Sequence, residues 1–428
     1  MLKNKKIYMI PVFGFMVLIL ILTLLLMLPI STNGSFDNLN LIFLATSAVT
    51  GTGLTTSVVS QNLSLFGQII LMLAIQIGAL GFMIFFSLIL FARNKKIRLI
   101  DTLILSNEIN FSNNIRVKEK VKNIIKYTFI IEFFGAMLLA INFIPEYGVS
   151  KGIWYGIFHS VSAFCNSGID LIGDASLEKY ATNIPINIIT MIIMFCGGIG
   201  YFVLQDIHDC IISGRKKLQI YTKITLVTSL LIIVSATIFL KILMPSLTIL
   251  QAMFYSITSR STGFFTVNPT TLNSSSKLLV VFLMFIGGGA GSTAGGIRLL
   301  NFAILCLLPL ATIRDEEIVI GYRKIDINTI KKSITIVISY VFLVIVAFMI
   351  LLSTESINSM DLLFEIVSAF TNTGLSTFDI NDLAILGKII LIIYMYIGRL
   401  GPITFLALFT SKSKQINSVS YPNADLML

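Results

Sequence analysis

Hydrophobic residues in this chain form long runs that short polar segments separate. Runs long enough to cross a hydrocarbon core of about 30 Å, which takes roughly 20 apolar residues, lie at 7–30, 67–91, 125–145, 184–204, 224–244, 278–310, 333–352 and 384–410. The first run is longer than the apolar part of a signal peptide and lacks a small-residue cleavage site, so we interpret it as a span. The pattern predicts an all-α polytopic membrane protein with eight transmembrane helices.

A shorter element recurs between these runs. Four amphipathic stretches of about 12 residues are too short to cross a bilayer, and we interpret them as re-entrant pore half-helices. Each is followed by a hydroxyl residue and a glycine, as Thr52-Gly53, Ser167-Gly168, Thr262-Gly263 and Thr373-Gly374. A repeat of this kind determines the whole fold. It predicts four units of helix, half-helix and helix (M1-P-M2) around one central pore.

The repeat divides the chain into five parts. The first unit is 1–95, and the second, with a cytoplasmic linker, is 96–213. The third unit, 214–313, has a broken second helix with a glycine-rich loop at 287–296. The fourth unit is 314–410, and a cytoplasmic C-terminal tail follows at 411–428.

Composition and charge indicate where the chain resides. With 56% hydrophobic and 12% charged residues, a soluble globular protein is excluded. The net charge of +10 comes from Lys and Arg in the N-terminal segment, in three alternate loops and in the tail. Loops rich in these residues stay cytoplasmic, so both termini are predicted to be cytoplasmic. The basic residues are scattered without an aromatic platform, which indicates contact with membrane lipid and no nucleic acid.

The residues that enzymes need do not occur in a usable pattern. The four cysteines lack metal-ligand spacing, and the two histidines have neither a carboxylate partner nor a second histidine at i+4. We find no nucleophile, metal cluster or acid pair. The sequence therefore predicts no catalytic residue, no transition metal, no cofactor in this chain and no enzymatic function.

The four glycine turns are candidates for a cation site. Non-helical backbone at membrane depth is tolerated where it lines a water-filled cavity, and four such turns indicate a shared axis. A half-helix that enters from outside points the negative end of its dipole at that axis, and backbone carbonyls turned inward can replace the hydration shell of a monovalent cation. No ring of carboxylates is present, which argues against a divalent cation. The predicted filter residues are Gly53, Gly168, Gly263, Gly374, Thr52, Ser167, Thr262, Thr373, Thr50, Asn166, Ser261 and Asn372.

Residues 286–298, IGGGAGSTAGGIR, have three interpretations. A phosphate-binding loop needs a lysine where Ile297 stands. A small-residue packing strip explains Gly287, Gly291 and Gly295 but not the other glycines. Since each glycine inside a helix costs up to about 1 kcal/mol relative to alanine, this density favours an unwound segment that lines a pore.

At these residues the sequence resembles the Trk/Ktr/HKT superfamily of potassium transporters, over nearly its whole length and most of all the KtrB membrane subunit. The resemblance implies potassium uptake across the plasma membrane of a prokaryote, with K⁺ as the transported ion and Na⁺ as a candidate activator. It also implies that the glycine-rich loop is an intramembrane gate. The gate residues would be Gly287, Gly288, Gly289, Ala290, Gly291, Ser292, Thr293, Ala294, Gly295, Gly296 and Arg399.

The resemblance implies partners as well. The family's membrane subunit is a homodimer that rests on a cytoplasmic ring of nucleotide-binding regulatory subunits of the RCK/KTN type. The basic loops and the tail would then be docking surfaces. One departure is Ala290, where the family loop has a proline, and this departure predicts a softer gate.

Three charged residues fall within predicted membrane segments, where such residues are functional by default. For Arg399 we favour a positive barrier and an anchor of the gate over a salt bridge to an acid such as Glu132. For Arg260 we expect an ion pair that buttresses the filter, with Glu365 as the candidate partner. For Glu132 we expect a paired, structural role.

One alternative function stays open beside filter-based uptake driven by the membrane potential. A coupled secondary transporter, such as a cation symporter, would bind its substrate at the midplane of the membrane. Such folds often contain two inverted repeats, whereas four parallel repeats favour a pore.

Overall fold

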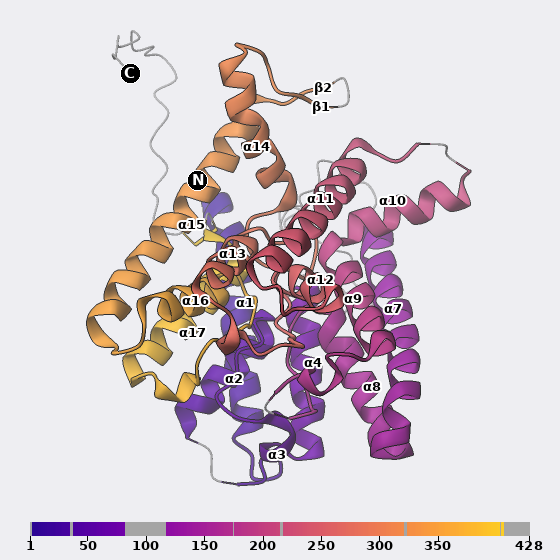
Figure 1. Cartoon of the computed structure of the whole chain (residues 1–428), viewed down its shortest axis with the longest axis vertical. Helices are drawn as coiled ribbons and strands as arrows, with labels where there is room; N and C mark the ends of the chain where they lie inside the picture. Colours follow the sequence, from indigo (N-terminus) through magenta and orange to yellow (C-terminus); the bar gives the residue numbers. More distant parts are fainter. Residues whose placement is uncertain are drawn as a thin grey trace.

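The computed structural model is helical nearly throughout and describes residues 2–34, 37–81, 117–173, 175–214, 217–320, 323–402 and 404–405. A small antiparallel sheet of β1 (Val319–Ile320) and β2 (Arg323–Lys324) follows α14 (Leu299–Ile313) and projects beyond the helices (Figure 1). The predicted boundary at 95/96 and the predicted tail lie outside the described residues.

Four long helices begin the four predicted units: α1 (Leu2–Leu26), α7 (Val117–Tyr147), α11 (Ile220–Leu243) and α15 (Ile327–Thr354). Each contains an apolar segment long enough to cross a membrane. Their outer faces expose large apolar side chains, as with Leu24 (66%) and Phe133 (65%). Such faces suit contact with lipid rather than water.

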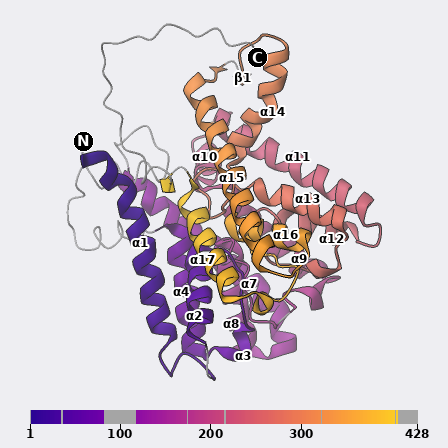
Figure 2. The same cartoon turned by 90° about the vertical axis from the view of Figure 1, so that its left-hand side faces the viewer.

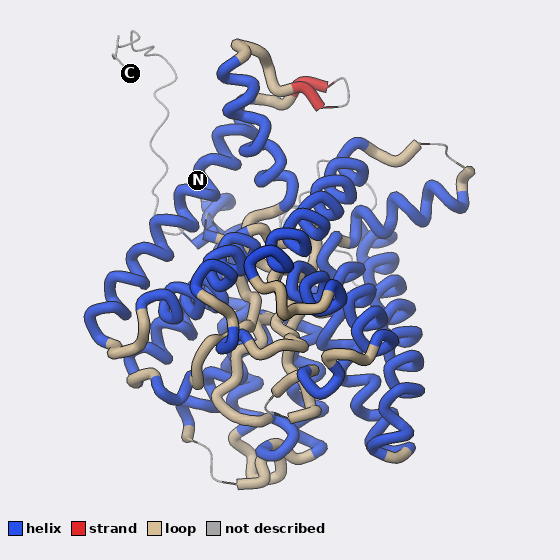
Figure 3. The backbone as a smooth tube through the Cα atoms, in the orientation of Figure 1, coloured by secondary structure: helices blue, strands red, loops and turns tan. Residues whose placement is uncertain are grey.

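Four short helices follow where the amphipathic stretches predicted them: α2 (Asn38–Thr50), α8 (Val149–Phe164), α12 (Ile249–Thr258) and α16 (Ser359–Phe370). Local chemistry begins two of them, since Thr248 and Gln251 form a capping box and Asn358 accepts from the Met360 amide. Their C-terminal halves are buried. Loops gather between the helices at the centre of the molecule, where these short helices end (Figure 3).

The second helix of each unit ends at or close to a glycine in the described structure. These helices are α4 (Leu65–Leu80), α9 (Ile184–Ile199), α13 (Ser274–Phe285) and α17 (Ile385–Leu400). Gly200, with φ of 95°, ends α9, and α10 (Tyr201–Ile212) leaves at 98°. Residues 286–298 separate α13 from α14. By length and composition, the described residues hold four spanning helices, or five if α9 and α10 count as one.

The second helix of each unit packs against the short helix of the next. Contacts join α4 to α8, α9 to α12, α13 to α16 and α17 to α2. The last of these contacts returns to the first unit, so the order of packing is cyclic. Figures 1 and 2, which differ by a quarter turn, both place α17 close to α16 and α1 close to α2. Short turns complete the outer loops: α3 (Val59–Asn62), η2 (Glu178–Tyr180), η3 (Pro269–Thr271) and η4 (Ile380–Asp382).

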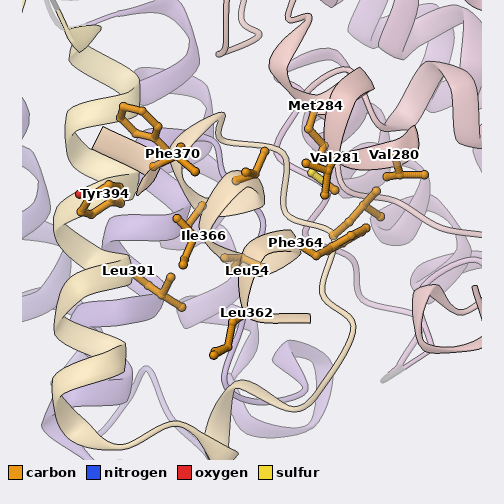
Figure 4. Close-up of a cluster of buried hydrophobic side chains, with 14 of the residues drawn as sticks. Leu54, Val280, Val281, Met284, Leu362, Phe364, Ile366, Phe370, Leu391 and Tyr394 are labelled. Atoms are coloured by element: carbon orange, nitrogen blue, oxygen red, sulfur yellow. The ribbon is translucent and has the colours of Figure 1, made fainter. Parts of the chain in front are cut away.

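The largest hydrophobic cluster lies between the third and fourth units (Figure 4). Apolar side chains of α16 fill the space between α13 and α17, and Leu54 of the first unit joins them. Phe364 and Phe370 are fully buried here. Burying a side chain of this size contributes roughly 1.5–3 kcal/mol, which holds the end of α16 firmly in place. The labelled members are Leu54, Val280, Val281, Met284, Leu362, Phe364, Ile366, Phe370, Leu391 and Tyr394.

Candidate functional site

The four predicted filter glycines meet in one closed ring, which we call the glycine ring (Gly53, Gly168, Gly263 and Gly374). A Cβ atom added to Gly53 would lie 2.1 Å from the Ser167 carbonyl oxygen, and one added to Gly168 would lie 2.1 Å from that of Thr262. The series continues from Gly263 to the Thr373 carbonyl at 2.5 Å, and from Gly374 to the Thr52 carbonyl at 2.1 Å. Each glycine thus lies against the carbonyl of the next unit, and the fourth closes on the first.

The backbone conformation explains why glycine occupies these positions. All four have positive φ, at 99°, 69°, 93° and 86° in chain order. A side chain would be strained there and would also overlap the neighbouring carbonyl. The absence of a side chain therefore permits the turn. It also permits the close approach of the four extended backbone segments that contain these glycines (the four strands of the ring).

The residue two positions before each ring glycine is also left-handed: Gly51 (φ 67°), Asn166 (52°), Ser261 (76°) and Asn372 (53°). The sequence-based set contains Thr50 instead of Gly51. Thr50 is the last residue of α2, and its hydroxyl lies 2.7 Å from Thr52 Oγ1. Counting back the same number of residues from each glycine would have found Gly51.

Side chains at this level connect neighbouring units. The two polar atoms of the Asn166 amide lie 2.9 Å from Thr262 Oγ1 and 2.9 Å from Thr293 Oγ1, so both hydroxyls are bonded whichever way the amide is turned. Ser261 Oγ donates to the Asn372 carbonyl at 2.8 Å. Asn372 Nδ2 in turn donates to Thr52 Oγ1 at 2.8 Å.

A cavity of about 320 Å³ adjoins the ring on the side of the outer loops. All four ring glycines line it, together with residues of the loops that follow them. Asp170 also lines it, and its Oδ1 accepts from the amides of Ile172 and Gly173. The cavity leads to the ring, so a small hydrated ion in it would meet the four strands.

The glycine-rich loop (287–296), together with the residues that flank it, contacts several units. It is closed at its base, where Gly287 N donates to the Ile297 carbonyl at 3.0 Å. Gly289 N donates to the Gly198 carbonyl of the second unit at 2.8 Å. On the fourth unit, a Cβ added to Gly295 would lie 2.3 Å from the Thr371 carbonyl. The loop therefore contacts the units on both sides of its own.

Arg399 contacts this loop, as expected of an anchor. Its Nη1 donates to the Thr293 carbonyl at 2.6 Å, and its Nη2 donates to the carbonyls of Gly78 at 2.6 Å and Ala79 at 2.9 Å. One guanidinium of the fourth unit thus joins the loop to the end of α4 in the first. The Gly78 and Ala79 carbonyls lie at the C-terminus of α4, where a positive charge is favourable.

A tyrosine holds the middle of the loop. Ala290 N donates to Tyr221 Oη at 2.8 Å, a bond that a proline at this position could not make. Arg298 Nη1 donates to the Gly289 carbonyl at 3.0 Å. Ala290, where a proline was expected, therefore donates a hydrogen bond to Tyr221 of α11.

The ion pair expected between Arg260 and Glu365 is absent from the described structure. Arg260 is 7% exposed, its Nη1 donates to Ser229 Oγ at 2.6 Å, and its Nε has no partner among the described residues. Glu365 accepts from Ser376 Oγ at 2.8 Å. Arg260 thus bonds to α11 of its own unit, and Glu365 bonds to the outer loop of the fourth unit.

Glu132 is buried in α7, where its carboxylate lies 3.9 Å from Cys165 Sγ. Within the described ranges no group of three His, Cys, Asp or Glu side chains could hold a metal ion. The oxygens that lie against the ring glycines are the backbone carbonyls of Thr52, Ser167, Thr262 and Thr373. These are ligands for a monovalent cation rather than for a transition metal.

Known proteins resemble this chain over most of its length. The chain is 34% identical to the potassium/sodium uptake protein NtpJ of Enterococcus hirae, over 97% of this chain and 95% of that protein. It is 33% identical to Ktr system potassium uptake protein B of Bacillus subtilis, over 96% and 94%. It is 31% identical to the protein of the same name from Vibrio alginolyticus, over 89% and 86%.

The fold also matches a solved structure, that of the potassium transporter TrkH from Vibrio parahaemolyticus. The TM-score is 0.78 at 19% identity, and the match covers 95% of this chain and 85% of that one. The polytopic helical fold predicted from the hydrophobic runs is thereby confirmed. The model of the TrkH family, described as a cation transport protein, matches residues 2–250 and 218–421. The resemblance to the Trk/Ktr superfamily and the prediction of a transport protein rather than an enzyme are therefore correct, and the chain belongs to the TrkH family of cation transport proteins.

Proposed function

We propose that this protein takes up potassium ions through the glycine ring, which acts as a selectivity filter made of backbone carbonyls. The observation that carries this proposal is the closure of the ring, in which each glycine lies against the carbonyl of the next unit. The relatives named as potassium uptake proteins support K⁺ as the ion. The name of NtpJ includes sodium, which keeps Na⁺ as a second ion to be measured.

The ring has the electrostatic properties that such a filter needs. Four short helices point their C-termini, each carrying about half a negative charge, at the ring. The carbonyls of Thr52, Ser167, Thr262 and Thr373 add oxygen ligands without formal charge. A dehydrated monovalent cation can be stabilised there and still leave, which conduction requires.

In the same proposal the glycine-rich loop is the gate and Arg399 its anchor. The loop contacts the second, third and fourth units just below the ring, and Arg399 extends this contact to the first. A segment so placed obstructs the axis of the four strands. Its glycine content makes it easier to rearrange than a helix would be.

The assembly and orientation belong to the proposal too. Two relatives carry names that refer to a Ktr system, which supports a regulatory partner for this chain, and we propose a homodimer on a ring of nucleotide-binding subunits. The distribution of Lys and Arg supports cytoplasmic termini in the plasma membrane. Co-purification with the partner and labelling of a cysteine placed at each terminus would test these points.

Uptake of rubidium, a K⁺ substitute, tests the function. Cells that lack their own potassium transport should take up Rb⁺ when they express the chain with its cognate regulatory subunit, and uptake should follow the membrane potential at about 2.3 kcal/mol per charge per 100 mV. A coupled symporter would instead require a second ion in a fixed ratio. Cells that express the folded protein and take up no Rb⁺ would contradict the proposal.

The filter assignment has its own test in Gly53→Ser. The Cβ of a serine would lie only 2.1 Å from the Ser167 carbonyl oxygen. One strand must therefore shift outward. We expect the ratio of K⁺ to Na⁺ uptake to fall at least about tenfold, the effect of about 1.4 kcal/mol. An unchanged ratio in a folded variant would remove Gly53 from the filter.

A further inference from the structure

The glycine-rich loop is hydrogen-bonded to the turns that lead into the glycine ring. Thr293 of the loop lies 2.9 Å from the amide of Asn166, and the same amide lies 2.9 Å from Thr262 Oγ1. Asn166 stands two residues before Gly168, and Thr262 stands one residue before Gly263. One loop side chain is thus connected to the strands of the second and third units.

A second connection runs through Ser261. Gly295 N of the loop donates to Ser261 Oγ at 2.7 Å, and Ser261 Oγ donates to the Asn372 carbonyl at 2.8 Å. Ser261 and Asn372 both have positive φ, so each belongs to the turn that presents its ring glycine. The loop is therefore connected to the strands of the third and fourth units as well.

The side chains that make these connections are buried. Asn166, Ser261, Thr262 and Thr293 are 1% exposed, and Asn372 is fully buried. A buried polar group that loses its partner does not regain it from water and carries the full desolvation penalty. The loop therefore cannot leave its position without a rearrangement of the turns that hold the ring.

The connections are not spread evenly around the ring. Side chains bridge the second unit to the third, the third to the fourth, and the fourth to the first. The equivalent position in the first unit is Gly51, which has no side chain to bridge to the second. The loop joins the two bridged seams that flank its own unit.

We propose that Thr293 and Ser261 are positioning residues that couple the gate to the filter, so that the seated loop and the ion-selective ring stabilise each other. Displacement of the loop frees the turns at Asn166 and Ser261, and the second and third strands lose their support. Because such coupling is reciprocal, a cation that holds the strands in place also favours the seated loop. This inference rests on the proposed functions of ring and loop.

Matched substitutions test the coupling. Thr293→Val and Ser261→Ala remove the bonded hydroxyls and change the side-chain volume little. Thr222→Val and Ser276→Ala are their controls, because these hydroxyls are buried in the same unit and have no partner in the described structure. We expect the ratio of Rb⁺ to Na⁺ uptake to fall about fivefold in each test variant, as for loss of one hydrogen bond, and to stay within twofold in the controls. Gly53→Ser is measured in parallel.

The outcomes separate the inference from the function on which it rests. If Gly53→Ser lowers selectivity while Thr293→Val and Ser261→Ala retain both uptake and selectivity, the coupling is wrong and the filter stands. If Gly53→Ser has no effect, the filter assignment itself fails, and the coupling fails with it.

Hydrogen exchange keeps the test valid if the variants do not fold. In the wild-type full chain in lipid nanodiscs, the amides of 286–298 should exchange at least about threefold more slowly in potassium chloride than in choline chloride, since an occupied ring favours the seated loop. A segment far from the ring, such as 327–354, should show no such difference. Equal exchange of 286–298 in both salts would overturn the coupling.

Discussion

At the scale of single residues, the ring is most sensitive where a backbone carbonyl from the neighbouring unit occupies the space of a side chain. Gly168 is the most closely surrounded, because a Cβ there would meet the Thr262 carbonyl at 2.1 Å and Gly263 Cα at 2.8 Å. Both neighbours are backbone and cannot rotate away. A change at Gly168 therefore reaches two units together.

We predict that Gly168→Ala lowers Rb⁺ uptake more than tenfold. The left-handed conformation costs a non-glycine residue roughly 1–3 kcal/mol, and the overlap with Thr262 adds to it. Gly148→Ala is the control, because Gly148 has φ of 78° but nothing within 4 Å of an added Cβ. Uptake by that variant should stay within twofold; equal losses in both variants would point to backbone strain instead of the ring.

Arg260 is a buried charge without an ion pair among the described residues. It stands three positions before Gly263, and its hydrogen bond is to a neutral hydroxyl. The corresponding positions in the other units, Thr50, Cys165 and Thr371, carry no charge. The ring is thus electrostatically asymmetric, with a fixed positive charge behind its third strand.

We predict that Arg260→Gln strengthens cation binding. The repulsion between the guanidinium and a cation in the ring is about 1 kcal/mol. Removing it should lower the apparent KM for Rb⁺ on the order of fivefold. Arg260→Lys retains the charge and should retain the KM, while Ser229→Ala controls for the lost hydrogen bond. A KM that rises in Arg260→Gln would show that packing, and not charge, is the contribution of this side chain.

At the scale of elements, the glycine-rich loop is held by side chains of other helices more than by its own structure. Tyr221 of α11 accepts from Ala290 N, and Arg399 of α17 donates to the Thr293 carbonyl. Glycine-rich backbone pays a large conformational entropy when it is ordered. The external bonds therefore decide how often the loop leaves its place.

Tyr221→Phe should loosen the loop at a contact remote from the ring. Loss of one hydrogen bond costs about 1 kcal/mol, so flux in the absence of activation should rise about fivefold, and the coupling of loop and ring predicts that the K⁺ to Na⁺ ratio falls with it. Tyr394→Phe, which removes a bond to the Leu343 carbonyl in another unit, is the matched control. Unchanged basal flux in a folded Tyr221→Phe protein would count against the loop as a gate.

At the scale of the whole molecule, stability depends on contacts between units, since each second helix packs on the next short helix. Between the third and fourth units the cluster of Figure 4 is joined by an ion pair, Lys277 to Asp361 at 2.6 Å. Its side chains are 12% and 19% exposed. Little solvent screens this pair, unlike the exposed pair of Lys324 and Glu317.

Lys277→Met is predicted to lower the free energy of unfolding by about 1 kcal/mol or more, because Asp361 is left partly buried and unpaired. Lys324→Gln should change it by less than about 0.5 kcal/mol. Thermal unfolding in the same detergent gives both values. If the two variants behave alike, the ion pair between the units contributes nothing beyond that of a surface pair.

Much of this architecture could be read from the chain alone because it depends on local physics. The four short helices follow from amphipathic stretches too short to span, and the ring glycines follow from their repeated place after those stretches. The family followed from the same residues. Positions 166, 261 and 372 were also found, whereas Gly51 was missed because Thr50 was counted in place of the aligned residue.

Tertiary structure decided what depends on distant parts of the chain. The break at Gly200 lies inside an apolar run and leaves no mark on hydropathy, so the predicted span 184–204 runs through it, and most of α10 lies where a loop was expected. Arg260 found Ser229 and not Glu365, since the direction of a buried side chain depends on the helices packed around it. By itself the sequence determined four repeated units and the glycines that follow their short helices, both set by periodicity and backbone preference. Only the fold decided that the fourth unit closes on the first and that the loop is bonded to the ring, because those contacts join residues that are remote in sequence.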